Sequence, residues 1–174
     1  MSDEAITMIR LIVPAEKYQD AYIAGLKELM QESARPELFQ REIDDAADYV
    51  RRAHAGMLGL AAGAPRSDFW LMDGDEYVGT IQIRHKPSGR HPGTESHVYY
   101  DVRPSKRKMG YGAKILELGL EEAKALGIGE LIVGCLEANI PSRKIIEKNR
   151  GMLKEKVKTP EGLVLKFAIP LEFP

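Results

Sequence analysis

The segment Glu130–Leu136 constrains the fold more than any other part of the sequence, because it is nearly all apolar. A strand with one wet face alternates apolar and polar residues, whereas a continuous apolar run is typical of a strand covered on both faces. The chain also supplies segments with apolar residues at three- and four-residue steps, at 18–30, 38–57 and 111–126, as amphipathic helices require. The sequence therefore predicts a mixed α/β domain in which helices cover this strand.

The remaining elements follow from the same patterns and from turn residues. Strands are expected at 6–13, 69–72, 77–84, 97–102, 130–136, 153–158 and 163–171, and helices at 18–30, 36–57, 111–126 and 141–149. The second helix is expected to bury Leu38, Phe39, Ile43, Ala46, Ala47, Val50, Ala53 and Met57. A hairpin turn is expected at 73–76, a loop at 86–94 and a helix C-cap at Gly127. No repeat or linker interrupts the chain, which predicts one domain over residues 1–174.

Composition excludes several classes of protein. The 174 residues are 44% hydrophobic and 29% charged, which is enough apolar material for a core. No run approaches the roughly 18 apolar residues of a membrane span, and the acidic start does not suit a signal peptide, so we expect no membrane association. A net charge of −1 gives no general attraction for nucleic acid. One cysteine, Cys135, forms no internal disulfide, which suits the cytoplasm.

The segment 98–114 combines features of an anion site. A predicted strand runs into a turn carrying the cations Arg103, Lys106, Arg107 and Lys108, and then Gly110-Tyr-Gly112 opens a helix. Glycines allow a ligand to approach the backbone, and the amides of a first helical turn have no partner within the helix. The helix dipole and the cations add attraction for a diphosphate. A solvated basic turn before a helix would show the same pattern.

Two nucleotide-binding motifs fit this segment poorly. A P-loop needs Gly-x-x-x-x-Gly-Lys-Ser/Thr, which is absent. A Rossmann fingerprint needs a third glycine where Ile115 stands, and its glycines directly follow a strand. Glu137 at the end of the next strand imitates the ribose-binding acid, so a dinucleotide-binding oxidoreductase is a weak alternative.

A known family has the same ordered motifs. Arg107-Lys-Met-Gly110-Tyr-Gly112-Ala113 resembles the Arg/Gln-x-x-Gly-x-Gly/Ala acetyl-CoA signature of the GNAT superfamily of N-acetyltransferases. Strand 131–136, Asn139-Ile-Pro-Ser142, a short helix and Gly151 resemble its second signature. The segments 103–105, 142–144 and 147–149 look especially like a bacterial subgroup of predicted acetyltransferases. The similarity covers roughly residues 95–152.

The resemblance implies a mixed central sheet with helices on both faces and acetyl-CoA as co-substrate. In GNAT enzymes the amides after the signature arginine hold the pyrophosphate, and the preceding strand splays from the next one to bind the pantetheine arm. Residues implied at the cofactor are Tyr100, Val102, Arg107, Lys108, Met109, Gly110, Tyr111, Gly112, Ala113, Asn139 and Ser142. A fixed strand amide would stabilise the negative charge on the acetyl oxygen. Asn139 is equally explained as a helix-start residue.

We expect the acetyl group to be transferred directly to an amine in a ternary complex, since no convincing nucleophile is available for an acetyl-enzyme. A base must deprotonate the ammonium, and His97 and Glu95 flank the position that family members use. Ile146 stands where many members have a tyrosine acid, so Tyr99, Tyr100, Tyr111 or water would protonate the thiolate. This departure leaves open a non-catalytic acyl-CoA-binding or sensing domain.

Other groups carry little chemistry. The four histidines lack metal-ligand spacing, so no metal is expected. The acidic cluster Glu42, Asp44, Asp45 and Asp48 is either a solvated face or an attraction for a cationic amine. In the family, acceptor specificity comes from the regions that correspond to 15–64 and 86–94, where no motif identifies a small-molecule or a peptide amine. The last two strands often pair between subunits, which leaves a homodimer open.

Overall fold

A computed structural model describes residues 8–58 and 63–172. Its strands are β1 (Ile9–Ile12), β2 (Arg66–Asp73), β3 (Glu76–Ser88), β4 (Ser96–Val102), β5 (Glu130–Leu136), β6 (Met152–Thr159) and β7 (Gly162–Pro170), and its helices are α1 (Gln19–Glu32), α2 (Pro36–Asp44), α3 (Ala46–Met57), α4 (Tyr111–Ala125) and α5 (Ile140–Lys148). Across these residues no helix is both long and apolar enough to span a membrane.

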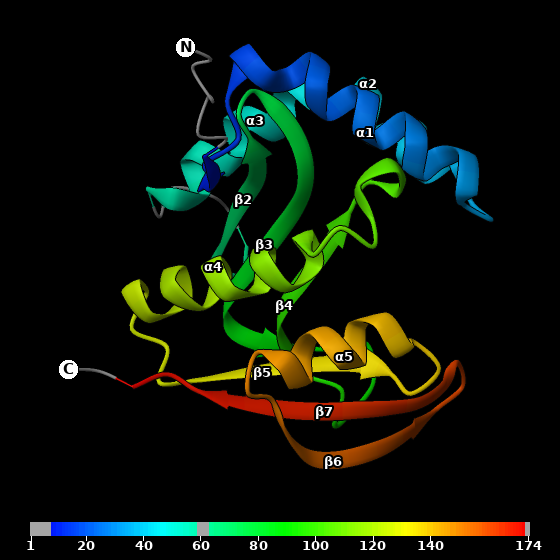
Figure 1. The fold of residues 1–174 in the computed structure, drawn as a ribbon, viewed down its shortest axis with the longest axis vertical. Coiled ribbons are helices and arrows are strands. Elements are labelled where there is room, and N and C mark those ends of the chain that lie inside the picture. The colour runs from blue at the N-terminus through cyan, green and yellow to red at the C-terminus, as the bar shows by residue number, and fades with distance from the viewer. Residues whose placement is uncertain (1–7, 59–62, 173–174) are drawn as a thin grey trace, which may run out of the picture.

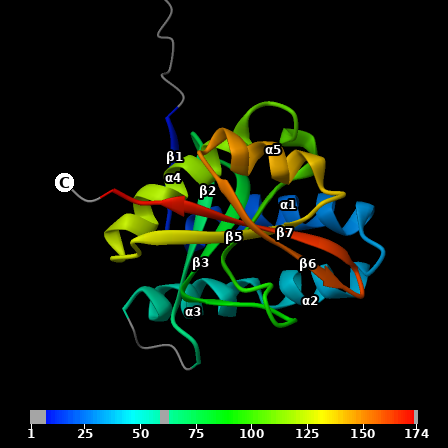
Figure 2. The same ribbon diagram turned by 90° about the horizontal axis from the view of Figure 1, so that it is seen from below.

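The strands form two antiparallel sheets in the orders β1-β2-β3-β4 and β5-β7-β6, which meet where β4 lies beside β5 (Figure 1). Helices α4 and α5 lie on one side of the sheets and α2 and α3 on the other (Figure 2). This is the predicted single α/β domain with helices on both faces.

Two cores fill the space between the helices and the sheets, and the first of them extends to β5 and β7 of the second sheet. Alternate residues of β2 point to opposite faces, so Phe69 and Leu71 join one core while Trp70 and Met72 join the other. The first core contains Ile115 and Leu116 of α4, and the second contains aromatic residues of α1 and β3. The β2 strand is therefore covered on both faces. In β5, by contrast, buried residues alternate with half-buried ones, so only one face of this strand is fully covered, and the expected coverage of both faces is wrong.

Local differences from the predicted elements have physical causes. The expected helix 36–57 breaks at Asp45 (φ −94°, ψ 8°) into α2 and α3, and α2 has no buried residue. Within the expected stripe, Leu38, Ala47 and Met57 are exposed, because the break changes the face that each helix presents. The expected loop at 86–94 begins later, because β3 continues to Ser88 past a register shift that accommodates Pro87.

The predicted ends of α4 are confirmed. Gly110 precedes its first residue in the left-handed conformation (φ 88°), and Gly127 (φ 80°) follows its last turn. Backbone bonds from Gly127 to Lys124 and from Ile128 to Ala123 close the C-terminus, as in the usual glycine cap. The expected first strand, 6–13, is β1 here, and residues 6 and 7 lie outside the described residues.

Candidate functional site

The turn between β4 and α4 presents free backbone amides. Lys108 (φ 61°) and Gly110 (φ 88°) both adopt left-handed conformations, and no side chain caps the N-terminus of α4. The first internal bond of the helix runs from Lys114 N–H to Gly110 C=O, so the amides of residues 111–113 have no partner within the helix. A Cβ on Gly110 would meet no atom within 4 Å, so the space beside this backbone is open. These amides, together with the helix dipole, can hold an anion.

Most cations of this turn hold the turn in place. Arg103 bonds to Glu28 of α1, Lys106 pairs with Glu76 at 2.7 Å, and Arg107 pairs with Glu32 at 2.6 Å. The Arg103 guanidinium holds the pKa of Glu28 down to about 2, with smaller contributions from bonds to Ser105. The expectation that all four cations attract the diphosphate is therefore revised, because α1 and β3 already supply carboxylates to three of them.

Arg107 and Lys108, two cations of this turn, differ in their contacts. Arg107 also donates from Nε to Val102 C=O at 3.1 Å, and it thereby fixes the end of β4. Lys108 makes no ion pair with any other described residue, so its charge remains available to a ligand.

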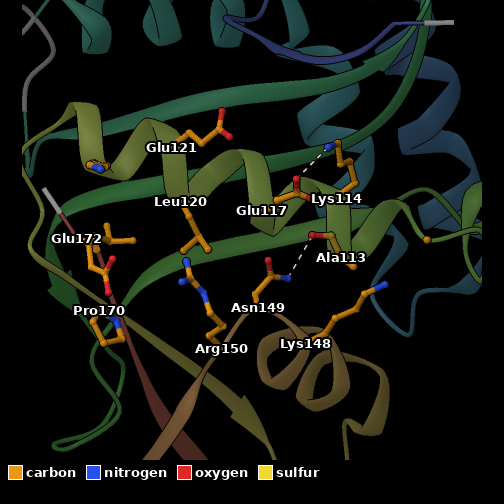
Figure 3. Close-up of a pocket in the computed structure, with 13 residues that line it drawn as sticks. Ala113, Lys114, Glu117, Leu120, Glu121, Lys148, Asn149, Arg150, Pro170 and Glu172 are labelled. Carbon is orange, nitrogen blue, oxygen red and sulfur yellow. Dashed lines mark hydrogen bonds and ion pairs between the residues drawn. The ribbon is translucent and has the colours of Figure 1, made fainter. Parts of the chain in front are cut away.

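A groove of ≈ 670 Å³ starts at Gly110 and Ala113 and runs along α4 (Figure 3). Its opposite wall is the end of α5, where Asn149 donates to Ala113 C=O at 3.2 Å and to Ile145 C=O at 3.0 Å. Lys148 and Arg150 line the same wall and make no ion pair in the part of the chain that the structure describes. The groove therefore extends the free amides with two available cations.

No backbone ladder joins β4 to β5, and side chains hold the first part of β4 to β5 instead. The Ser96 hydroxyl donates to Ile132 C=O at 3.3 Å and accepts from Gly134 N–H at 3.4 Å. The Nδ1 atom of His97 accepts from Ile132 N–H at 2.9 Å.

Farther along, the hydroxyls of Tyr100 and Ser142 bond at 2.9 Å across the split between the strands. Asn139 caps α5 by accepting from Ser142 N–H at 3.2 Å, so its helix-start role is confirmed. The split thus carries two hydroxyl groups beside the unladdered edge of β4.

The opposite face of β4 borders a cleft of ≈ 450 Å³ between α1, α2, α3 and the first sheet. Its wall includes a rigid aromatic group, in which Tyr22 stacks on Trp70 at 4.6 Å and meets Tyr77 edge-on at 5.3 Å. Asp101 lines the cleft and accepts from the Tyr99 hydroxyl at 3.2 Å through Oδ2, while its buried Oδ1 has no hydrogen-bond partner.

Two carboxyl groups in this cleft have raised pKa values. Burial raises the pKa of Asp101, and burial followed by the charge of Asp101 raises the pKa of Glu42. A carboxyl group with a raised pKa at a cleft is a candidate proton acceptor. Asp101 was not predicted from the sequence, although the alternation that places Tyr99 and Asp101 on one face of β4 was an available signal.

Comparison with known proteins now identifies the family. The model of the Acetyltransferase (GNAT) family matches residues 23–152. The chain belongs to the GNAT family. No curated protein sequence matches it significantly.

Solved GNAT structures share its fold. The ribosomal L7/L12 α-N-protein acetyltransferase RimL, in complex with coenzyme A, superposes with a TM-score of 0.72 at 15% identity, covering 95% of each chain. The microcin C7 self-immunity acetyltransferase MccE, in complex with acetyl-CoA and AMP, gives 0.71 at 12% identity, covering 93% of this chain and 92% of that one. The aminoglycoside acetyltransferase AAC(6′)-Ib, in complex with coenzyme A, gives 0.63 at 15% identity, covering 94% and 95%.

The two bases that the GNAT resemblance implied lie away from the cleft lining. His97 is 7% exposed, and burial lowers its pKa. A neutral imidazole has one acceptor nitrogen, and Ile132 N–H already occupies it. Glu95 accepts from Gly93 N–H at 3.0 Å and pairs with Lys166 at 3.1 Å. The pKa of Glu95 is lowered first by a hydrogen bond from its own backbone amide and then by the bond to Lys166.

The position of the common GNAT tyrosine is fully buried here, since Ile146 is 0% exposed in the first core. Three tyrosines could replace it. The Tyr111 hydroxyl donates to Asp73, and this bond is the largest of several causes that raise the pKa of Tyr111 to about 12. Tyr99 bonds to Asp101. Burial raises the pKa of Tyr100 to about 12, while its bond to Ser142 lowers it, and it lies at the split between β4 and β5.

The acidic cluster of the second predicted helix is divided. Glu42 and Asp45 line the cleft, whereas Asp44 accepts from Gln40 at 2.9 Å and Asp48 pairs with Arg51 on the surface. Among the residues that the structure describes, no group of three His, Cys, Asp or Glu side chains is placed to hold a metal ion.

Proposed function

We propose that this GNAT protein transfers the acetyl group of acetyl-CoA to an amine by direct transfer in a ternary complex. The observation that carries the proposal is the position of β4, which has the split from β5 on one side and the carboxyl-lined cleft on the other. A donor arm in the split and an amine in the cleft would meet at this strand, as proximity catalysis requires.

The free amides, the groove beside α4 and the edge of β4 support binding of the donor at this site. The amides of Gly110–Ala113 would hold the pyrophosphate, with Lys108 and Met109 completing the turn. Lys148 and Arg150, on the groove that continues from these amides, are placed for the remaining phosphate. The edge of β4 around Tyr100 and Val102 would bind the pantetheine arm.

Proton transfer on the acceptor side is assigned to Asp101. Its pKa is raised, its Oδ1 has no partner, and it lines the cleft. A carboxylate there can take the ammonium proton directly or through water, and the free amine then attacks the acetyl carbon. A strand amide at the β4 edge would stabilise the oxygen that gains negative charge. We consider His97 and Glu95 weaker candidates for the base than Asp101, because the side chains of His97 and Glu95 already bind other groups.

Proton transfer to the leaving thiolate is assigned to the Tyr100–Ser142 pair. The two hydroxyls lie 2.9 Å apart in the split where the sulfur would emerge. Tyr100 would donate its proton to the thiolate while the Ser142 hydroxyl donates a hydrogen bond to the phenolate that forms, and solvent water would then return a proton to Tyr100. This pair takes over the function that a tyrosine at position 146 would have.

Thiol release from acetyl-CoA, measured over amines, polyamines, amino acids and peptides, tests the proposal. Turnover with at least one acceptor, and a melting temperature raised by CoA but not by NAD, is the expected result. Binding of acetyl-CoA without turnover on any acceptor would favour a sensor, and a rise in melting temperature with NAD alone would favour an oxidoreductase.

The single, buried thiol of Cys135 agrees with a cytoplasmic location.

A further inference from the structure

The acceptor cleft contains both kinds of charge: its carboxylates are Glu42, Asp45 and Asp101, and its cations are Arg41, Arg52 and Arg66. Asp101 belongs to β4 and Glu42 to α2, whereas Arg52 belongs to α3 and Arg66 to β2. A cleft for a simple polycation would need only carboxylates. The arginines therefore require a separate explanation.

The carboxyl side of the cleft fits an ammonium group. Neither Asp101 nor Glu42 forms an ion pair with another described side chain, and burial raises the pKa of each. The ring of Tyr22 lies close enough for both carboxylates to raise its pKa, after burial, which is the larger cause. An ammonium between these groups would gain the attraction of both carboxylates.

The arginine side of the cleft opens into a second groove, of ≈ 700 Å³, which shares Arg52 and Arg66 with it. Arg84 is the third arginine of this groove, and Asp68 is its one acidic residue within the described chain. Asp68 is already paired with Arg66 at 3.1 Å. Small residues such as Ala53 and Gly56 form much of the remaining wall, so the positive charge is accessible.

Arg41 and Arg52 are the cleft arginines with no ion pair to another described residue, and of these two Arg52 also lines the second groove. Within residues 8–58 and 63–172 it makes no ion pair, while Arg84 donates to the carbonyls of Ser96 at 3.2 Å and Ser88 at 3.4 Å. A guanidinium without a carboxylate partner is suited to bind a carboxylate or phosphate through two parallel hydrogen bonds. It lies at the junction of the acidic cleft and the arginine groove.

We propose that the acceptor is a small amine that also carries an anionic group, either a carboxylate or a phosphate. Its ammonium lies between Asp101 and Glu42, and its anion lies at Arg52 and Arg66. This inference rests on the proposed acetyl transfer, for which it names the class of acceptor. Carboxylate and phosphate share the same chemistry toward arginine, so the experiment separates them.

The test compares matched acceptors in the acetyl-CoA thiol-release assay. Phenylalanine is compared with phenethylamine for the carboxylate, and O-phosphoethanolamine with ethanolamine for the phosphate, with rates corrected for the fraction of free amine. In at least one pair we expect kcat/KM to be roughly 10-fold or more higher for the anionic member, as for a hydrogen bond to a charged group. The pair that shows the preference identifies the anion.

The variant Arg52→Gln removes the charge at an exposed position, so folding is not at risk as it would be at Arg66, whose loss would leave buried Asp68 unpaired. It should reduce the preference toward unity. Arg51→Gln, one position earlier on α3 and paired with Asp48 at the surface, is the control and should keep the preference.

The outcomes separate the inference from the proposed function. Efficient turnover of neutral amines or polyamines, with no preference for an anionic partner or with a preference that Arg52→Gln leaves intact, would overturn the inference and retain acetyl transfer. Turnover of none of the amines, polyamines, amino acids or peptides, by protein that binds acetyl-CoA, would overturn both.

Discussion

Replacement of Asp101 by asparagine separates the catalytic and structural effects of one carboxyl group. The amide keeps the shape of the side chain and can accept from the Tyr99 hydroxyl, which lies 3.2 Å from Oδ2. It cannot accept the ammonium proton. Loss of a general base lowers kcat/KM on the order of 10²–10⁴-fold, which corresponds to about 3–5 kcal/mol.

The same substitution should stabilise the fold near neutral pH. Because burial raises the pKa of Asp101, the folded state holds this proton more tightly than the unfolded chain does. Stability from this group is therefore complete below the unfolded pKa of 3.8 and is lost as the pH rises through the higher folded pKa. The Asp101→Asn variant has no buried charge at this position, so the melting temperature of the variant should exceed that of the native chain at pH 7. The difference should disappear below about pH 3.8.

The assay is steady-state thiol release at saturating acetyl-CoA from pH 6 to 9, with melting curves recorded over a wider range. Asp44→Asn, on the exposed surface of α2, is the matched control and should change neither quantity. His97→Gln and Glu95→Gln should each retain most of the activity. Near-full activity in Asp101→Asn, or the large loss in one of these two variants instead, would refute the assignment of the base.

Four further outcomes follow from the contacts of the donor site. Gly110→Asp should lose CoA affinity in calorimetry because its charge opposes the phosphates, and should lower the melting temperature because φ 88° is strained for a residue other than glycine, although its Cβ meets no atom; unchanged affinity would contradict the anion site. Gly112→Val should instead lower the melting temperature, because a Cβ there lies 2.6 Å from Ile145 Cδ1; unaltered stability would show that Ile145 moves aside. Lys148→Ala should weaken CoA by about 1.5–3 kcal/mol and dephospho-CoA less; equal losses would place the third phosphate elsewhere. Glu28→Gln should lower the melting temperature at pH 7, because the lowered pKa stabilises the fold above the unfolded value of 4.5, and the deficit should vanish as the pH falls through the folded pKa of about 2; a deficit that persists at pH 2 would contradict this linkage.

The sequence was sufficient for the elements that one segment determines. The apolar run of β5, the glycine before α4 and the glycine after it are local signals, and each is where the patterns predicted it. The break at Asp45 was not predictable, because apolar residues continue at helical spacing across it and no glycine or proline marks it.

The site shows the same division between local and distant information. The free amides of the α4 turn follow from the glycines, but the partners of its cations lie more than 25 residues away: Arg103 and Arg107 contact Glu28 and Glu32 of α1. Asp101 is one polar residue in a strand until the fold places Tyr22 and Glu42 opposite it. Residues whose role depends on a distant partner could not be found from spacing alone.

A crystal structure of the protein with coenzyme A tests the central claim most directly. The pyrophosphate should accept hydrogen bonds from the amides of residues 110–113, and the pantetheine arm should enter the split between β4 and β5 with its thiol beside Tyr100 and Ser142. Coenzyme A bound elsewhere on the molecule, or a split that stays closed while the ligand is bound, would contradict the proposed acetyl transfer at β4.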